Sequence, residues 1–523
     1  MSAAASDEAE ALYSLGNRLW REGARQAALA AFEEAVALAP GDAEARNNFG
    51  NALLETGQAD AAIPQLEAVI ALRPDHAAAH YNLGNALLAA GRAEDAAVSF
   101  RAALRCNPEH AGAHNNLGNA LRALGQPAEA AASYREAVRR LPREAGAHNN
   151  LAAALLALHR PAEAVAALRA ALRCDPDHAD ACNNLGGALL ALDRPEEALT
   201  WFRRASALDA AQVQARFGES LALLTLGRFR EGWEAYESRW LDPQFCRDER
   251  TYDAPLWQGE DVTGRTLLLH AEQGLGDTIQ FARYAPLLRR RGARVVLEVQ
   301  APLVTLLRNL GEDVVAAGDD LPPHDAHCPL LSLPRLFRTE LPTVPAETPY
   351  LHADPALRAR WRAVLGPRTL PRVGLALSGS AEHPEDALRS IPAETLRPLL
   401  ALPCIEWHLV QKELRDADAA VLHAHPNLRN HARRLGDFAD TAALLAELDL
   451  LVSVDTSVAH LAGALALPVW LLVQSNPDFR WLRMRADSPW YPTMRLFRQT
   501  EMLRWAVTVA RVAQALRARY DAS

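Results

Sequence analysis

The first 240 residues of the chain repeat with a fixed period of 34 residues. Five similar segments mark the period: NFGNALLETG, NLGNALLAAG, NLGNALRALG, NLAAALLALH and NLGGALLALD, which begin at Asn48, Asn82, Asn116, Asn150 and Asn184. A glycine closes most of these segments, and a proline returns in the same register at Pro40, Pro74, Pro108, Pro142 and Pro176. Glycine is typical of a helix end and proline of the start of the next helix. Each unit is therefore predicted to be a pair of helices that buries its apolar face by stacking on its neighbours.

The period and the recurring Leu-Gly, Ala and Pro positions resemble the tetratricopeptide repeat. Small residues in the first helix of each unit alternate with large ones in the second, such as Phe100 and Tyr134. The resemblance implies an all-α superhelix over residues 8–240, with a capping helix at Phe229–Trp240. It also implies a groove, lined mainly by the first helices, that binds a protein or peptide.

One polar column runs through the predicted array. Asn48, Asn82, Asn116, Asn150 and Asn184 occupy the same position in five consecutive first helices. Asn costs roughly 0.6 kcal/mol relative to Ala inside a helix, so its repetition needs a reason. An amide can donate to and accept from a peptide backbone, and the column resembles the Asn ladder in the groove of the family that contains O-linked N-acetylglucosamine transferases. The alternative is a hydrogen bond between adjacent repeats or to water.

A different pattern begins at Arg265. Apolar β-type runs alternate with helical patterns, which predicts parallel sheets. The proline-rich stretch 321–355 is predicted to be irregular, and the aromatic residues of the connector are expected to pack between domains. The last helix is expected to pack across both halves. The predicted divisions are a connector at 241–264, a first Rossmann-like half at 265–355, a second half at 371–499 and a C-terminal helix at 500–523.

A strand, a tight turn, a helix and another strand are predicted in the segment ELDLLVSVDTSVAHLAGALALPVWLLV, which begins at Glu447. The turn would lie at the carboxyl end of a parallel strand, where open α/β sheets bind ligands. Backbone N–H groups of Thr456, Ser457 and Val458 would face an anion there, and His460 could add a donor. The alternative is that Asp455 or Thr456 only caps the helix and that His460 is a surface residue.

Two motifs resemble the ADP-heptose:lipopolysaccharide heptosyltransferases. They are GLGDTIQFARYAPLL at Gly274–Leu288 and DTSVAHLAGALALPVWLL from Asp455, and the resemblance covers Arg265 to about Gln499. It implies a two-Rossmann (GT-B) fold in which Asp277 is the catalytic base. The implied donor-binding residues are Asp455, Thr456, Ser457, Val458, His460, Arg389, Gln411 and Lys412.

Three features depart from that family. Ser457 replaces a glycine, Arg389 replaces a lysine, and the first half, at about 85 residues, is shorter. An alternative role for Asp277 is the N-cap of a helix that starts at Thr278.

Composition argues against several classes of function. The net charge of −9 gives no electrostatic reason to expect nucleic acid or an anionic membrane as a partner. The six cysteines are scattered without metal-type pairs, so no metal site or disulfide framework is expected. The N-terminus lacks a secretory pattern, and no apolar run reaches the ~18 residues of a membrane span. These features predict a cytoplasmic protein without a cofactor.

The sequence as a whole predicts an inverting, metal-independent glycosyltransferase. Its donor would be a nucleotide-diphosphate sugar, and its acceptor a protein or glycan held by the tetratricopeptide groove, where the Asn column would contact it. The alternative is a tetratricopeptide scaffold with a catalytically inactive glycosyltransferase-like domain.

Overall fold

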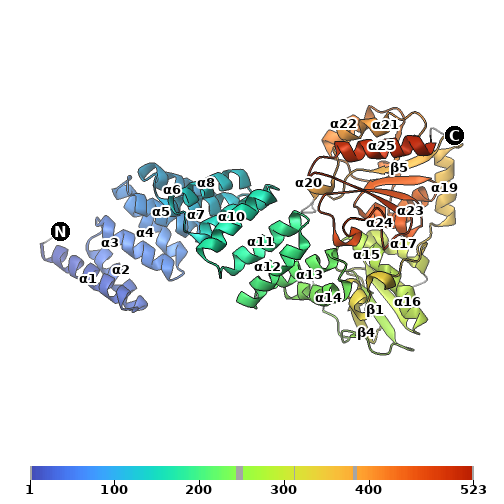
Figure 1. Ribbon diagram of the computed structural model, residues 1–523. Helices are drawn as coiled ribbons and strands as arrows, with labels where there is room; N and C mark the ends of the chain where they lie inside the picture. Colours follow the sequence, from blue (N-terminus) through green and yellow to red (C-terminus); the bar gives the residue numbers. More distant parts are fainter. Residues whose placement is uncertain (1–2, 243–250, 311–312, 381–385, 521–523) are drawn as a thin grey trace. The chain divides into compact units, whose positions relative to one another are not determined.

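The computed structural model describes residues 3–242, 251–310, 313–380 and 386–520 (Figure 1). The chain divides into two compact units. The first comprises Met1–Leu192 and Thr200–Gln212, and the second comprises Asp193–Leu199 and Val213–Ser523.

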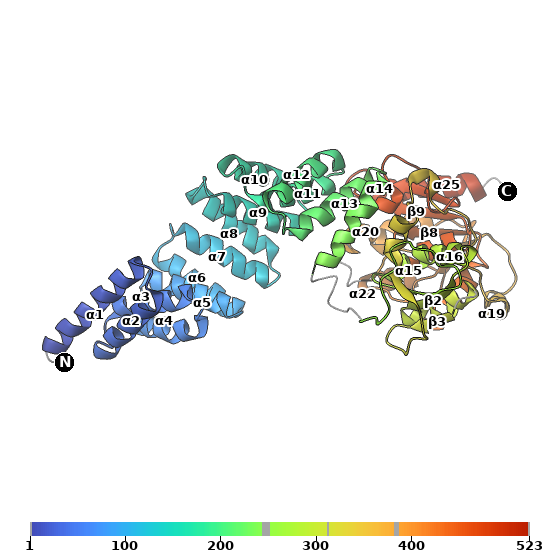
Figure 2. The same ribbon diagram turned by 90° about the horizontal axis from the view of Figure 1, so that it is seen from below.

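The first unit is a series of helical hairpins, as the 34-residue period predicts (Figure 2). Large side chains of second helices fill the space left by small residues of first helices. A Cβ added at Gly118 would lie 2.5 Å from the ring of Tyr134, and that ring is fully buried. The helices of the array are α1 (Ala3–Arg21), α2 (Arg25–Leu38), α3 (Ala43–Glu55), α4 (Ala59–Leu72), α5 (Ala77–Ala89), α6 (Ala93–Cys106), α7 (Ala111–Ala123), α8 (Pro127–Arg140), α9 (Ala145–Ala157), α10 (Pro161–Cys174), α11 (Ala179–Ala191) and α12 (Pro195–Leu208).

The second unit contains two parallel sheets. The first has the order β3-β2-β1-β4, with β1 (Thr266–His270), β2 (Arg294–Val299), β3 (Asp313–Ala316) and β4 (Ala326–Pro329). The second has the order β10-β9-β8-β5-β6-β7, with β5 (Arg372–Ala376), β6 (Glu406–Leu409), β7 (Leu428–Asn430), β8 (Leu450–Val454), β9 (Val469–Val473) and β10 (Met494–Arg498). Strand β4 lies in the stretch that the sequence predicted to be irregular, so that prediction was wrong there.

Helices connect the strands of both sheets, and a last helix follows β10. They are α15 (Leu275–Phe281), α16 (Ala285–Arg290), α17 (Val304–Leu307), α18 (Leu333–Leu336), α19 (Pro355–Leu365), α20 (Asp386–Arg389), α21 (Arg397–Leu400), α22 (Asp416–His423), α23 (Phe438–Leu445), α24 (Ser457–Ala464) and α25 (Ala506–Tyr520). Among the described helices, none combines the length and the apolar character that a membrane crossing requires.

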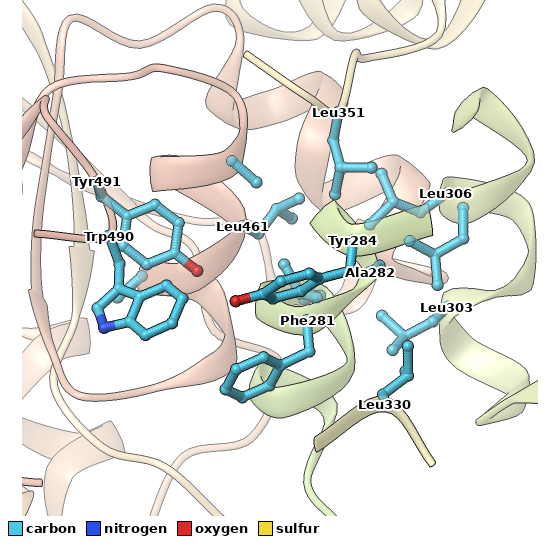
Figure 3. Close-up of a cluster of buried hydrophobic side chains, with 14 of the residues drawn as sticks. Phe281, Ala282, Tyr284, Leu303, Leu306, Leu330, Leu351, Leu461, Trp490 and Tyr491 are labelled. Atoms are coloured by element: carbon cyan, nitrogen blue, oxygen red, sulfur yellow. The ribbon is translucent and has the colours of Figure 1, made fainter. Parts of the chain in front are cut away.

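One apolar core joins the two sheets (Figure 3). Phe281 and Tyr284, which follow β1, face Trp490 and Tyr491 from the loop before β10 (Figure 3). The rings of Phe281 and Trp490 meet edge to face with centroids 5.8 Å apart. The two halves of the α/β region therefore share buried surface.

Helix α25 belongs to the second sheet alone. Its buried side chains, such as Val509 and Leu516, pack in a separate cluster with Val373 and Trp407. The expectation that this helix packs across both halves was wrong, because it packs on β10, α21 and the 3-10 helix Ala393–Leu396, all from the second half.

The last helical hairpin, α13 (Val213–Thr225) and α14 (Phe229–Tyr236), belongs to the α/β unit. The sequence assigned it to an array that ended at residue 240. Its aromatic residues explain the difference, because the ring of Trp233 lies 5.4 Å from that of Phe479 and 5.9 Å from that of Phe281. The connector also packs on this unit: Trp257 is buried in the same core, and Tyr252 stacks on two histidines of the first sheet.

Candidate functional site

A cavity of about 410 Å³ lies at the carboxyl ends of strands from both sheets. Strand order reverses between β1 and β4 in one sheet and between β5 and β8 in the other. Open α/β sheets bind ligands outside the carboxyl ends at such points. The wall comes from the loops after β1, β5, β8 and β9 and from α15, α20 and α24: Gly274, Leu275, Gly276, Asp277, Gly379, Ser380, Arg389, Asp455, Thr456, Ser457, His460, Gln474, Asp478 and Arg480.

Most of the residues predicted for the site line this cavity. They are Asp277, Arg389, Asp455, Thr456, Ser457 and His460. Val458, Lys412 and Gln411 do not line it. Val458 packs against the apolar core, and Lys412 Nζ lies 3.3 Å from the carbonyl oxygen of Gly436.

Gln411 does not reach the cavity either, although the sequence predicted that it contacts a nucleotide. Its side chain is only 6% exposed. Oε1 accepts the N–H of Leu377 at 2.7 Å, and Nε2 donates to Ser378 Oγ at 2.8 Å. The amide therefore holds the loop after β5, and the nucleotide contact of this residue stays a prediction.

The N-terminus of α24 opens toward the cavity without a side-chain cap. Thr456 occupies the N-cap position, but no side-chain oxygen there accepts a hydrogen bond from the helix. The backbone N–H groups of Ser457 and Val458 have no intrahelical acceptor, whereas that of Ala459 donates to the carbonyl oxygen of Thr456 at 3.0 Å. The helix dipole makes this end favourable for an anion. The alternative that Asp455 or Thr456 serves as a cap is therefore wrong for this helix.

Asp455 and His460 interact with each other beside this helix end. Oδ2 of Asp455 accepts the indole N–H of Trp481 at 2.7 Å, and Oδ1 lies 3.6 Å from Nε2 of His460. Nδ1 of His460 lies 2.9 Å from the hydroxyl oxygen of Tyr491. Burial alone would raise the pKa of Asp455, but His460, Trp481 and the charge of Arg480 hold it below its usual value. The carboxylate is therefore ionised at neutral pH.

His460 is neither a surface residue nor a free donor. It is 5% exposed, and both ring nitrogens face protein groups. A Cβ added at Gly276 would lie 2.9 Å from Cδ2 of the ring. The glycine therefore lets α15 of one half approach α24 of the other, with the imidazole between them.

Asp277 lies at the third position of α15 and is held through both oxygens. Oδ2 accepts the N–H of Gly274 at 3.0 Å, and Oδ1 forms an ion pair with Arg480. The helix starts at Leu275, not at Thr278, so the predicted alternative of an N-cap at Asp277 is wrong in its position. The carboxylate still stabilises the start of the helix, because it accepts the backbone N–H of the N-cap residue Gly274, as the third helical residue does in a capping box.

Arg480 connects three parts of the site. Nη1 donates to both oxygens of Asp478 at 2.8 Å, Nε donates to Oε1 of Gln280 at 2.8 Å, and Nη2 pairs with Asp277. The side chain is 7% exposed and stacks over Phe479 with its centre 4.4 Å from the ring centroid. Burial raises the pKa of Asp478, while Arg480 opposes that rise.

Arg389 supplies the other cation of the wall. Its Nε lies 3.5 Å from Oδ1 of Asp386, too far for a strong hydrogen bond, and within the described residues this Nε has no hydrogen-bond partner. Asp386 instead accepts from Arg415 and from Ser390 Oγ. The Arg389 guanidinium thus lines the cavity against the backbone of Gly379.

Sequence reasoning missed the loop after β9, which supplies Asp478, Arg480 and Trp481. A signal was present, because β9 adjoins β8 in the sheet and the polar run QSNPDFRW follows its apolar residues. The carboxyl end of β9 therefore had to lie beside Asp455.

The Asn column of the array makes hydrogen bonds between consecutive repeats. Each Nδ2 donates to the residue 35 positions earlier in the chain: to Tyr13 Oη at 2.7 Å, Asn47 Oδ1 at 3.2 Å, Tyr81 Oη at 3.2 Å, Asn115 Oδ1 at 3.0 Å and Asn149 Oδ1 at 2.9 Å. The donors are Asn48, Asn82, Asn116, Asn150 and Asn184 in that order. The side-chain N–H groups of the column therefore make the hydrogen bonds between adjacent repeats that were the alternative to peptide binding.

Comparisons with known proteins agree with the helical part. A family model described as Tetratricopeptide repeat matches residues 47–111, 85–145, 115–179 and 149–213, and a second model of the same description matches residues 9–42. The helical part is thus a tetratricopeptide repeat superhelix, and a C-terminal α/β region of parallel sheets follows it. Repeats of this type bind proteins or peptides.

Among curated proteins, the chain is similar to Protein FlbA of Caulobacter vibrioides, with 30% identity over 334 residues. The alignment covers 58% of this chain and 54% of FlbA, so the chain spans about half the length of that relative. Similar solved structures include YrrB, described as a TPR protein with an unusual peptide-binding site (26% identity, 36% of this chain, 98% of that chain, TM-score 0.33). Another is TTC0263, described as a thermophilic TPR protein in Thermus thermophilus (27% identity, 35% of this chain, 99% of that chain, TM-score 0.29).

Proposed function

We propose that the protein is an inverting, metal-independent glycosyltransferase of the GT-B type, which moves a sugar from a nucleotide-diphosphate donor to a protein or glycan acceptor. One observation carries the proposal: a single cavity joins Asp277 of the first sequence motif to Asp455, Thr456, Ser457 and His460 of the second. The two motifs come from different halves of the α/β region, as the catalytic base and the donor site do in the heptosyltransferases that the sequence resembles.

The sheet topology supports this proposal. Counted from β5, the six-stranded sheet has the order 3-2-1-4-5-6 of a Rossmann fold. Counted from β1, the four-stranded sheet follows the first four positions of the same order. Two such sheets with a cavity at their carboxyl ends form the arrangement expected of a two-Rossmann transferase.

The donor diphosphate would bind at the uncapped start of α24 and at Arg389. Backbone N–H groups and a guanidinium stabilise the charge that develops on a leaving diphosphate without a metal ion. Arg389 follows β5 and the amides of α24 follow β8, whereas Asp478 and Arg480 follow β9, and Asp277, which pairs with Arg480, follows β1 of the other sheet. This order directs the diphosphate toward β5 and the sugar toward Asp277.

Transfer would be a single displacement. The acceptor oxygen bonds to the anomeric carbon, the bond from that carbon to the diphosphate breaks, and Asp277 accepts the acceptor's proton. Each carboxylate oxygen of Asp277 has two lone pairs, and one bond to Gly274 or Arg480 leaves a lone pair on each oxygen for that proton.

The groove of the repeat array would hold the acceptor. Because the Asn column donates its N–H groups between repeats, it would contact a peptide through oxygens. Within the described residues, Oδ1 accepts no hydrogen bond in Asn48, Asn82, Asn150 and Asn184. Such a row of acceptors matches the backbone N–H groups of an extended peptide.

The alternative, a scaffold with an inactive transferase-like region, is favoured by the ion pair of Asp277 with a buried arginine. The direct test incubates the full chain with a panel of nucleotide-diphosphate sugars and follows nucleotide release and sugar transfer by mass spectrometry. Release that depends on the intact cavity supports the transferase. Nucleotide binding without release from any donor supports the scaffold.

A further inference from the structure

The last helical hairpin contacts the turn that carries Asp277. This turn, residues 271–277, is called the β1 turn here. Gln273 Nε2 donates to the hydroxyl oxygen of Tyr236, the last residue of α14, at 2.9 Å. Tyr236 is 3% exposed. Gln273 immediately precedes Gly274, whose N–H binds Asp277, so the tyrosine contact and the amide that holds the carboxylate belong to adjacent residues.

Arg239 binds the same turn from the 3-10 helix Glu237–Leu241, which follows α14. Its Nε donates to Oε2 of Glu272 at 2.6 Å, and Nη2 donates to Oε1 at 3.0 Å. The arginine is fully buried. Oε1 of Glu272 also accepts the N–H of Leu331 after β4, at 2.9 Å. Glu272 thereby joins the hairpin to the point where strand order reverses in the first sheet.

Helix α14 contacts the second loop of the site as well. The ring centroids of Trp233 and Tyr236 lie 5.4 Å and 6.4 Å from that of Phe479. Phe479 is the residue before Arg480, which pairs with Asp277. The same short helix therefore touches both chain segments whose side chains meet in the cavity.

These contacts are more specific than packing requires. Apolar residues would fill the same space, and a bidentate ion pair in a buried position depends on geometry that is satisfied in one arrangement only. The hydrogen bond from Gln273 to Tyr236 and the ion pair of Arg239 with Glu272 both end on the β1 turn and not on the sheet beneath it. Their effect is therefore to fix the position of that turn.

We propose that Tyr236 and Arg239 are positioning residues of the candidate site, which hold the β1 turn so that Asp277 faces the cavity. The claim that they fix the turn stands on these contacts alone. The claim that the fixed turn matters for turnover rests on the proposed function.

The test compares Tyr236→Phe with Tyr284→Phe in the full chain. Both tyrosines are buried in the same core, but the hydroxyl of Tyr284 bonds to Thr339, away from the β1 turn. Hydrogen exchange of the peptide spanning 271–277, read by mass spectrometry, should become about tenfold faster in Tyr236→Phe, because one hydrogen bond is lost. It should be unchanged in Tyr284→Phe.

Turnover of the donor found active on the wild-type chain should fall about tenfold in Tyr236→Phe, with KM for the donor within about twofold, since a misplaced base slows chemistry more than binding. Unchanged exchange in the turn would overturn the positioning claim, whatever the activity. Faster exchange with unchanged kcat in an active enzyme would overturn the role in turnover. If the wild-type chain turns over no donor, the proposed function fails, and the exchange result still decides the positioning claim.

A second variant guards against misfolding of Tyr236→Phe. Gln273→Met removes the same hydrogen bond from the side of the turn and keeps an unbranched side chain. It should reproduce the faster exchange, and the double variant should add little to either single one. Additive effects would contradict a direct contact.

Discussion

Arg480 and Asp277, which lie 203 residues apart in the chain, form a partly buried ion pair between the two halves of the α/β region. The same guanidinium binds both oxygens of Asp478, so one cation balances two carboxylates. The carboxylate expected to act as a base is thus oriented by a residue from the opposite half. Its geometry depends on the closed arrangement of the two sheets.

Arg480→Gln should destabilise the α/β unit by about 1–3 kcal/mol, because it leaves the carboxylates of Asp277 and Asp478, which are 20% and 35% exposed, without their cation. Arg485→Gln is a matched control from the same loop. Its partner Asp487 is exposed, and such surface pairs contribute about 0–1 kcal/mol. Urea unfolding followed by tryptophan fluorescence measures both, since all tryptophans except Trp20 and Trp201 lie in this unit. Equal midpoints for the two variants would mean that the partly buried pair adds nothing to stability.

Asp277→Asn should abolish transfer, with a loss of about 10²–10⁴ in rate, because an amide cannot accept the acceptor's proton. The amide oxygen can still accept the N–H of Gly274, so the start of α15 should remain formed. Donor affinity should change little, since the expected diphosphate contacts lie on α24 and Arg389. Steady-state kinetics and calorimetry with the same donor check these outcomes, and turnover retained in the variant would exclude Asp277 as the base.

Local patterns predicted the helical hairpins and most strands, because a 34-residue period and apolar alternation are set by neighbours in sequence. They also placed Asp277 and Asp455 after predicted parallel strands, at the carboxyl edge of a sheet. They did not reveal Arg480, since an ion pair across 203 residues depends on how two halves pack. The burial of Gln411 and the assignment of α13 and α14 to the α/β unit were missed for the same reason.

The Asn column should contribute little to stability in spite of its hydrogen bonds. In the triple variant Asn82→Ala, Asn116→Ala and Asn150→Ala, each lost bond costs about 1 kcal/mol, and each gain in helix propensity returns roughly 0.6 kcal/mol, a net loss of about 1 kcal/mol. Urea unfolding of the array, followed by circular dichroism, gives the value. A double-mutant cycle between Asn47→Ala and Asn82→Ala tests the pair directly. A coupling energy of zero would contradict the bond between these repeats.

Acid should destabilise the second sheet below about pH 6.5. Burial lowers the pKa of His408 to about 3 and that of His431 to about 4, and the two rings share a contact of 3.0 Å between Nδ1 and Nε2. The unfolded chain takes up protons near the ordinary histidine pKa, so the free energy of unfolding falls as pH drops from about 6.5. At pH 5 the loss is about 2 kcal/mol for each histidine. Urea unfolding between pH 7.5 and pH 5 measures the slope, in buffers of about equal ionic strength. A His408→Gln variant with the same slope as wild type would refute this origin.

Binding of nucleoside diphosphates to the cavity is the measurement that decides most directly whether this is a nucleotide-sugar site. Isothermal calorimetry on the full chain, in the presence of a chelator, should detect binding of at least one of the adenine, guanine, uracil and cytosine diphosphates. Arg389→Gln should weaken that binding at least about tenfold, the effect of one charge-assisted hydrogen bond, while Arg485→Gln should leave it unchanged. Absence of binding for all four diphosphates, or equal affinity in Arg389→Gln and wild type, would contradict a donor site at the start of α24.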